Sequence, residues 1–210
     1  MKIDLKGIKN IIFDLGGVIL DLNFNASVLA FYKLGLKEDV LDGKLAYSDK
    51  IFYQLQTGQV SPEKFRIRVR EILGKPEATD QQIDDAWSAM LDGIPFSRIE
   101  TIQKLRKKYK VFLYSNTNKI HIDKLEKEFS ENYGFSFASC FNEVFYSQEI
   151  HDAKPAVSSF LKIIELSGVN PHETLFVDDI QENIEGAEKA GLKTFWLKEE
   201  LEMNEIFKDN

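Results

Sequence analysis

The sequence predicts an α/β fold, a doubly wound parallel sheet with an inserted helical segment. Short apolar runs alternate along most of the chain with segments of helical periodicity, as in sheets built from strand–helix–strand units. Residues 21–95 differ, because they show helical signals without a clear strand. Polar residues directly follow the apolar runs, and ligands bind at the carboxyl ends of the strands in sheets of this kind.

Five apolar runs are the expected strands. Residues 10–13 and 17–20 are largely apolar on either side of Asp14, which suits a buried parallel strand and the turn after it. The other expected strands follow the inserted segment and are short, as is usual for buried parallel strands. They cover residues 110–114, 144–146, 174–177 and 193–197.

Helix signals lie between these strands. Residues 97–100 (Ser-Arg-Ile-Glu) match a capping box and predict a helix start. Pro155 is expected to begin a helix that runs to about residue 167 and stops at Gly168. Residues 182–190 predict another helix, which ends before Gly191.

The inserted segment carries its own helix signals. Ser61 before Pro62 is a typical helix start, and Thr79 with Gln82 matches a capping box. Residues 65–70 alternate between apolar and basic like a strand, so a strand stays open there.

We therefore expect two domains. Residues 1–20 and 96–210 would form the α/β core, and residues 21–95 would form a helical cap domain large enough to act as a lid.

Composition narrows the function classes. The chain has 210 residues, 43% of them hydrophobic, and a formal net charge of −7, so nucleic acids and anionic membranes are unexpected partners. No apolar run is long enough to span a bilayer, and the first residues lack the apolar stretch of a signal peptide. Its single cysteine excludes an internal disulfide. We expect a cytoplasmic monomer or weak homodimer.

Three carboxylates could form a metal site. Asp14 follows the first strand, and Asp178 and Asp179 follow the run 174–177. Adjacent like charges repel unless a cation lies between them, and Mg²⁺ prefers a few carboxylates together with water and phosphate oxygens. Each aspartate taken alone is as well explained by a helix cap or a turn.

A hydroxyl cluster and a lysine could bind phosphate. Ser115 and Thr117 follow the second expected strand, where hydroxyls and backbone amides can hold phosphate oxygens. Lys154 could neutralise a nucleophile and a phosphate. Alone, Ser115 and Thr117 are more simply helix caps, and a single lysine is usually a solvated surface residue.

The order of these groups along the chain is specific: Asp, Ser/Thr, Lys, then Asp-Asp. This order resembles the haloacid dehalogenase-like hydrolase superfamily, in its subgroup with a helical cap after the first strand. Residues 13–18, 115–118 and 178–187 are most similar to a branch of bacterial sugar phosphatases that includes an α-glucose-1-phosphate phosphatase.

The resemblance implies a set of Mg²⁺ ligands. Asp14 would be both the nucleophile and a ligand, and Gly16 would contribute its backbone carbonyl. Asp179 would bind the ion directly and Asp178 through water. Asn183 would support these ligands from outside the coordination shell.

The resemblance also implies groups that act on the phosphate. Ser115 and the backbone amide of Asn116 would hold it, and Lys154 would steady the transition state. The expected function is hydrolysis of a small phosphomonoester, a sugar phosphate, through an aspartyl-phosphate on Asp14.

Gly16 departs from the family pattern, because most phosphatases of the superfamily carry a second aspartate there as a general acid. Such help is typically worth about 10²–10⁴-fold in rate. We therefore expect a preference for leaving groups that need little protonation, such as anomeric, acyl or aryl phosphates. His151 and Asp152 are an alternative source of protons.

Three other readings remain open. A 2-haloacid dehalogenase would use Asp14 on carbon without a metal, which the Asp178–Asp179 pair disfavours. A receiver domain would place its acidic pair first in the chain, the reverse of the order here. A non-catalytic protein that binds a phosphorylated ligand, disabled by Gly16, is the alternative outside the enzymes.

Overall fold

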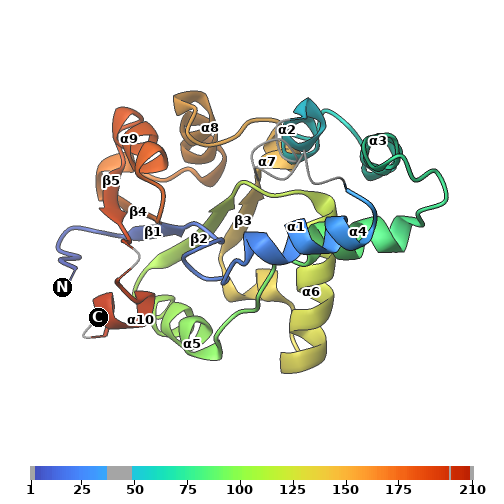
Figure 1. The fold of residues 1–210 in the computed structure, drawn as a ribbon. Helices are drawn as coiled ribbons and strands as arrows, with labels where there is room; N and C mark the ends of the chain where they lie inside the picture. Colours follow the sequence, from blue (N-terminus) through green and yellow to red (C-terminus); the bar gives the residue numbers. More distant parts are fainter. Residues whose placement is uncertain (1–2, 37–48, 199, 209–210) are drawn as a thin grey trace.

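The computed structural model describes residues 3–36, 49–198 and 200–208. Its centre is a parallel sheet of five strands in the order β3-β2-β1-β4-β5 (Figure 1). The strands are β1 (Asn10–Phe13), β2 (Lys110–Ser115), β3 (Glu143–Tyr146), β4 (Thr174–Asp178) and β5 (Lys193–Trp196). All five expected strands are present to within a residue or two at each end, and the predicted α/β fold class is confirmed.

Helices cover both faces of the sheet. One face carries α5 (Phe96–Leu105), α6 (Lys119–Tyr133) and α10 (Met203–Ile206), and the other carries α8 (Val157–Ser167) and α9 (Gln181–Lys189) (Figure 1). Side chains alternate along each strand, so Ile11 and Phe13 pack with α5 and α6 while Ile12 packs with α8 and α9. Short helices complete the fold: η2 (Phe137–Cys140), α7 (Ser147–Ile150) and η3 (Pro171–Glu173).

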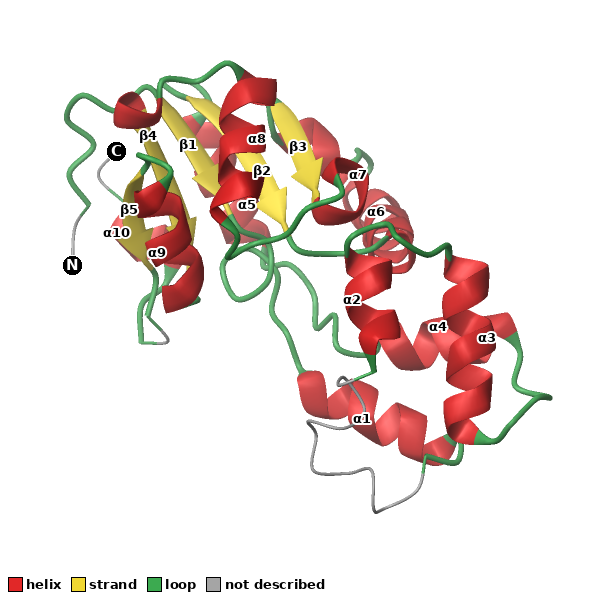
Figure 2. Cartoon of the chain, turned by 90° about the horizontal axis from the view of Figure 1, so that it is seen from above, coloured by secondary structure: helices red, strands yellow, loops and turns green. Residues whose placement is uncertain are grey.

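In the described part of the segment between β1 and α5, four helices form a separate cluster beside one edge of the core (Figure 2). We call them the cap helices: α1 (Phe24–Lys33), α2 (Lys50–Gln56), α3 (Pro62–Leu73) and α4 (Asp80–Ser88). Residues 65–70 are helical rather than extended, because Phe65, Val69 and Leu73 bury one face of α3 at helical spacing. Residues 37–48 of the expected cap lie outside the described residues, and the proposed domain limits stay a prediction.

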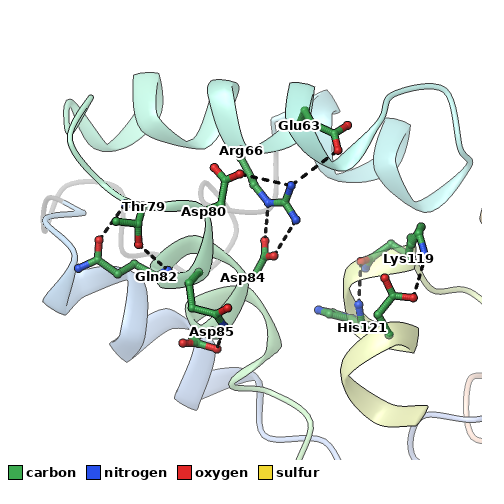
Figure 3. A network of polar contacts seen from close by, with 12 residues as sticks. Glu63, Arg66, Thr79, Asp80, Gln82, Asp84, Asp85, Lys119 and His121 are labelled. Atoms are coloured by element: carbon green, nitrogen blue, oxygen red, sulfur yellow. Dashed lines mark hydrogen bonds and ion pairs between the residues drawn. The ribbon is translucent and has the colours of Figure 1, made fainter. Parts of the chain in front are cut away.

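Helix starts agree only in part with their sequence signals. The capping box is present at α4, where Thr79 Oγ1 accepts from Gln82 N at 3.2 Å and Gln82 Oε1 accepts from Thr79 N at 2.9 Å (Figure 3). The predicted box at residues 97–100 is wrong, because α5 already begins after Pro95 and the Ser97 hydroxyl accepts from Asn204. None of the helices in the described part is long and apolar enough to cross a membrane.

The two connections between the cap helices and the core lie side by side. Asp21 N donates to Gly93 O at 3.0 Å, and Asp92 N donates to Asp21 O at 2.9 Å. The buried Arg98 of α5 donates from Nη1 to Asp21 Oδ1 at 2.7 Å and to Ile19 O at 3.1 Å. These contacts fix where the chain leaves and re-enters the core.

Candidate active site

The polar clusters meet at the carboxyl edge of the sheet. Asp14 directly follows β1, and its backbone amide continues the ladder by donating to Val177 O at 2.9 Å. Ser115 is the last residue of β2 and Asp178 the last of β4. Because β1 lies between β2 and β4, groups more than 160 residues apart in the chain are brought to one place.

Lys154 lies at the centre of this site. Its ammonium contacts Asp14 Oδ1 at 2.6 Å and Asp178 Oδ2 at 2.7 Å, and it donates to Tyr114 O at 3.2 Å. All three charged side chains are buried. Burial alone would lower the pKa of Lys154, but the charges of Asp14 and Asp178 raise it above its usual range. The lysine therefore stays cationic at neutral pH.

The pKa of Asp14 is raised by burial, and the charge of Asp178 adds to this effect while Lys154 opposes it. The lysine contacts Oδ1 of Asp14 and leaves the other carboxylate oxygen unengaged by that contact. An anionic nucleophile at this position thus depends on the neighbouring cation.

Asn116 holds the lysine in place. Its side-chain amide donates to Lys154 O at 2.8 Å, and its Oδ1 accepts from Lys154 N at 3.0 Å. Sequence reasoning identified only the backbone amide of Asn116 as a functional group. The paired side-chain bonds join segments 38 residues apart, and nothing in the local sequence signals them.

Asp178 is saturated by donors from the protein. Its Oδ1 accepts from Ile180 N at 2.8 Å, and the Asn183 amide lies at 3.0 and 3.1 Å from its two oxygens. With Lys154 also on Oδ2, both oxygens are occupied. A carboxylate held in this way is better placed to support a metal through water than to bind it directly.

Asp179 is the complementary case. Its buried Oδ1 has no hydrogen-bond partner among the described residues. One oxygen each of Asp14, Asp178 and Asp179 can be chosen so that all lie within 4.8 Å of one another. Burial raises the pKa of Asp179, and the charge of Asp178 raises it further. An oxygen-rich site with an unpartnered carboxylate oxygen fits a hard divalent cation.

Two glycines shape the loop after Asp14. Gly17 has φ +74°, and a Cβ there would lie 2.1 Å from Asp179 Oδ2, so only glycine admits this carboxylate. A Cβ on Gly16 would lie 2.6 Å from Leu22 Cδ1. The space that an acidic side chain at position 16 would enter is therefore taken up by Leu22.

The loop after β2 is fixed by two buried polar side chains. Thr117 N donates to Ser147 Oγ at 2.9 Å, and Asn118 Oδ1 accepts from His121 N at 3.2 Å, which caps α6. Ser115, the last residue of β2, directly precedes this loop and is buried. Ser147 was not predicted, because it follows another strand and carries no motif.

A cavity of about 640 Å³ opens from these groups toward the cap helices. The core contributes Asp14, Gly16, Ser115, Lys154 and Asp179, and the cap helices contribute mainly apolar and aromatic side chains. All the predicted site residues therefore lie at one edge of the sheet, although Asp178 is covered rather than exposed to the cavity.

His121 joins the two halves of the cavity wall. Its Nε2 lies 3.2 Å from Trp87 O, and its ring stacks on that of Trp87 at 4.8 Å between centroids. Since a carbonyl only accepts, Nε2 carries the proton. Burial lowers the pKa of His121 to about 4, so the ring is neutral at neutral pH.

Other candidates lie away from the cavity. His151 Nδ1 lies 3.2 Å from Thr57 O at the end of α2, so this histidine contacts the cap helices rather than the site suggested for it. Its neighbour Asp152 accepts from Ala153 N at 2.9 Å and lies 3.5 Å from Lys162 Nζ.

Two arginines of α3, Arg66 and Arg70, also contact groups outside the cavity. Arg66 lies among acidic side chains, with Nε and Nη2 donating to Asp84 at 2.9 and 2.7 Å (Figure 3). Arg70 donates from Nε to Ala78 O at 2.6 Å and pairs with Asp80. Both hold α3 to α4 and do not line the cavity.

Comparisons with known proteins identify the family of this chain. A family model of haloacid dehalogenase-like hydrolases matches residues 8–191. The chain is 35% identical over 189 residues to D-ribitol-5-phosphate phosphatase of Bacteroides thetaiotaomicron, covering 90% of this chain and 91% of that one. It resembles BT-2542, a haloacid dehalogenase family enzyme of that species solved with magnesium and inorganic phosphate, at TM-score 0.88 and 35% identity over 95% and 99% of the two chains. A predicted haloacid dehalogenase-like family hydrolase from Porphyromonas gingivalis matches at TM-score 0.83 and 35% identity over 92% of this chain and 93% of that one. The chain therefore belongs to the haloacid dehalogenase-like hydrolases.

Proposed function

We propose that the protein is a magnesium-dependent phosphatase that hydrolyses a small sugar or polyol phosphate through an aspartyl-phosphate on Asp14. The observation that supports this proposal most is the buried Lys154 bridging Asp14 and Asp178 beside the unpartnered Asp179 oxygen. Such a site combines an anionic nucleophile with fixed positive charge for a phosphoryl group.

In the first half of the reaction, a carboxylate oxygen of Asp14 would attack phosphorus. The bond from phosphorus to the ester oxygen breaks, and the alcohol leaves with the electron pair. Lys154 remains charged throughout and stabilises negative charge on the phosphoryl oxygens. Ser115 and the backbone amide of Asn116 are the nearby donors that would orient the phosphate.

In the second half, water would attack the aspartyl-phosphate, releasing inorganic phosphate and restoring the Asp14 carboxylate. Gly16 provides no acid or base for either half. The leaving alcohol must then take its proton from water or from a polar group of the cavity, which motivates our expectation that aryl and anomeric phosphates react faster than alkyl phosphates.

Asp14, the backbone carbonyl of Gly16 and Asp179 are the residues that would hold Mg²⁺, with Asp178 acting through water. When bound, the ion would offset the repulsion between the nucleophile and the substrate phosphate. This assignment is supported by the converging carboxylates and by BT-2542, which was solved with magnesium and phosphate.

The substrate class is suggested by a relative. The D-ribitol-5-phosphate phosphatase of Bacteroides thetaiotaomicron acts on a polyol phosphate, which is an alkyl ester. A screen should therefore contain polyol and sugar phosphates together with para-nitrophenyl phosphate. An alkyl ester that reacts as fast as the aryl ester would contradict the leaving-group expectation drawn from Gly16.

The decisive experiment measures hydrolysis of para-nitrophenyl phosphate with Mg²⁺, with EDTA, and by the Asp14→Asn variant. We expect activity only in the wild type with the metal. Acid-quenched enzyme should carry a phosphoryl group on the peptide that contains Asp14. Activity that survives Asp14→Asn would refute the covalent mechanism.

Halide release from a 2-haloacid and binding of inorganic phosphate with Mg²⁺ are the two measurements that separate the alternatives. A 2-haloacid dehalogenase would release halide without a metal, and the cluster of Asp14, Asp178 and Asp179 gives no support to that reading. A binding protein disabled by Gly16 would bind phosphate with Mg²⁺ but hydrolyse nothing. The oligomeric state stays a prediction.

A further inference from the structure

Gln56 is a polar residue on the side of the cavity that the cap helices line mainly with aromatic side chains. The cap helices contribute the aromatic side chains of Phe24, Phe52, Tyr53 and Trp87 to this wall, and Gln56 comes from the last turn of α2. Its side-chain amide makes no hydrogen bond to the described residues. A free amide both donates and accepts, so it suits a hydroxyl group on a ligand.

The backbone of Gln56 is connected through Ser147 to the loop that directly follows Ser115. Ser147 Oγ donates to Gln56 O at 2.6 Å and accepts from Thr117 N at 2.9 Å. Ser147 is fully buried, so neither bond is weakened by competing water. One hydroxyl thus fixes Gln56 relative to the residues that would bind the phosphate.

The end of α2 packs closely against α7, so it cannot shift without breaking these contacts. Gly58 has φ +66°, and a Cβ there would lie 2.2 Å from Gln148 O. His151 Nδ1 contacts Thr57 O beside it at 3.2 Å. These contacts between residues 56–58 and residues 147–151 hold the end of α2 against α7.

The charged side chains that line the cavity limit the charge of the leaving group that Gln56 would contact. Among the described residues that line the cavity, the charged ones are Asp14, Lys154 and Asp179, all near the phosphate end. Lys154 is held by two carboxylates and is not available to a second anion. A carboxylate or second phosphate on the leaving group would find no free cationic partner among the described lining residues.

We propose that Gln56 determines specificity by hydrogen-bonding a hydroxyl of an uncharged polyol or sugar leaving group, and that Ser147 is the residue that positions it. This proposal rests on the phosphatase function proposed above. It adds which residue hydrogen-bonds the leaving group and why that group is expected to be uncharged.

The first test is Gln56→Met, which keeps the length of the side chain and removes the amide. Gln59→Met is the matched control, because Gln59 lies exposed just beyond α2 and does not line the cavity. The readout is the ratio of kcat/KM for ribitol 5-phosphate to that for para-nitrophenyl phosphate, which has no hydroxyl. We expect Gln56→Met to lower this ratio about three- to tenfold, the value of one net hydrogen bond, and the control to leave it unchanged.

The second test examines Ser147 by a double-mutant cycle. Ser147→Ala should lower the same ratio, and combining it with Gln56→Met should give little further loss, because both changes remove one interaction. A purely structural serine would lower the melting temperature and slow both substrates equally, leaving the ratio unchanged.

The third test compares ribitol 5-phosphate with 5-phosphoribonate, in which a carboxylate replaces the terminal hydroxymethyl group. We expect kcat/KM to favour ribitol 5-phosphate, whose polyol leaving group is uncharged, about tenfold or more. Two results would overturn this proposal alone, provided that the wild type hydrolyses para-nitrophenyl phosphate. One is an unchanged ratio of kcat/KM for ribitol 5-phosphate to that for para-nitrophenyl phosphate in Gln56→Met. The other is an equal kcat/KM for ribitol 5-phosphate and 5-phosphoribonate. Loss of all magnesium-dependent hydrolysis in the wild type would overturn the proposed function and this proposal with it.

Discussion

Gly17 offers a sharp test of the metal site. In Gly17→Ala, the new Cβ would lie 2.1 Å from Asp179 Oδ2 and 2.6 Å from its Cγ. A Cβ atom essentially never lies within 3.0 Å of a heavy atom to which it is not bonded. The Asp179 carboxylate must therefore move away by about 0.9 Å, the difference between 3.0 and 2.1 Å. Mg²⁺ holds its ligands at about 2.0–2.1 Å and tolerates only about 0.2 Å of error, so Asp179 would no longer bind it well.

The matched control is Gly7→Ala. Gly7 has φ +77°, close to the +74° of Gly17, but a Cβ on Gly7 meets nothing within 4 Å. Both variants carry the backbone strain of an L-residue at positive φ, about 1–2 kcal/mol, which lowers the melting temperature by a few degrees. Only Gly17→Ala displaces the carboxylate.

The assay titrates Mg²⁺ against hydrolysis of para-nitrophenyl phosphate and against binding heat. We expect half-saturation to rise about ten- to hundredfold in Gly17→Ala and to stay at the wild-type value in Gly7→Ala. Equal magnesium requirements in the two variants would refute the assignment of Asp179 as a ligand. Equal melting temperatures would show that strain contributes equally in both.

Three further outcomes follow from the buried charges and the cavity. In urea unfolding at pH 7, Lys154→Met should lose about 3–5 kcal/mol of stability, because two buried carboxylates lose their cation. The control is Lys162→Met, which replaces an exposed lysine and should lose at most about 1 kcal/mol. Similar losses in the two variants would contradict the central role of Lys154. His121 has a pKa of about 4 when folded and 6.5 when unfolded. The unfolded state therefore binds its proton first, and stability falls between about pH 6.5 and pH 4. Between pH 7 and pH 5 the wild type should lose about 2 kcal/mol more than His121→Gln, and equal losses would contradict a neutral buried imidazole. Gly16→Asp combined with Leu22→Ala, which makes room for the new side chain, should raise turnover of glycerol phosphate relative to para-nitrophenyl phosphate at least about tenfold. An unchanged ratio would show that protonation of the leaving group is not limiting.

The strands were the part of the fold most readily predicted. Burial on both faces requires continuous apolar runs, and short runs bounded by polar residues carry that signal without any tertiary information. The carboxyl ends of parallel strands share one edge, so Asp14, Ser115 and Asp178 could be expected to meet before any coordinate was known. The order of the motifs then indicated the family, which the family model and the relatives confirmed.

Helix starts were less predictable, because a local signal competes with the rest of the fold. The Ser-Arg-Ile-Glu pattern at residues 97–100 has the chemistry of a capping box, but Pro95 already begins α5 and the Ser97 hydroxyl accepts a hydrogen bond from Asn204 instead. The helix predicted to start at Ser61-Pro62 is confirmed. The alternation at residues 65–70 had left a strand open there, and burial of Phe65, Val69 and Leu73 against the other cap helices favours the helix.

The contacts that tune the site were beyond sequence reasoning. The Asn116 side chain holds the Lys154 backbone, Ser147 joins the loop after β2 to the cap helices, and Leu22 fills the space beside Gly16. Each contact joins segments whose spacing in the chain has no periodicity. None of them is therefore visible in a local pattern.

The sequence by itself determined the fold class, the family and the identity of the charged groups, because these depend on residue type and on order along the chain. Only the tertiary structure decided how those groups divide their work. Asp178 is saturated by Lys154, Asn183 and a backbone amide, while Asp179 keeps an oxygen without a partner. Two adjacent aspartates are equivalent as letters, and they differ only because folding surrounds one with donors and turns the other toward the cavity.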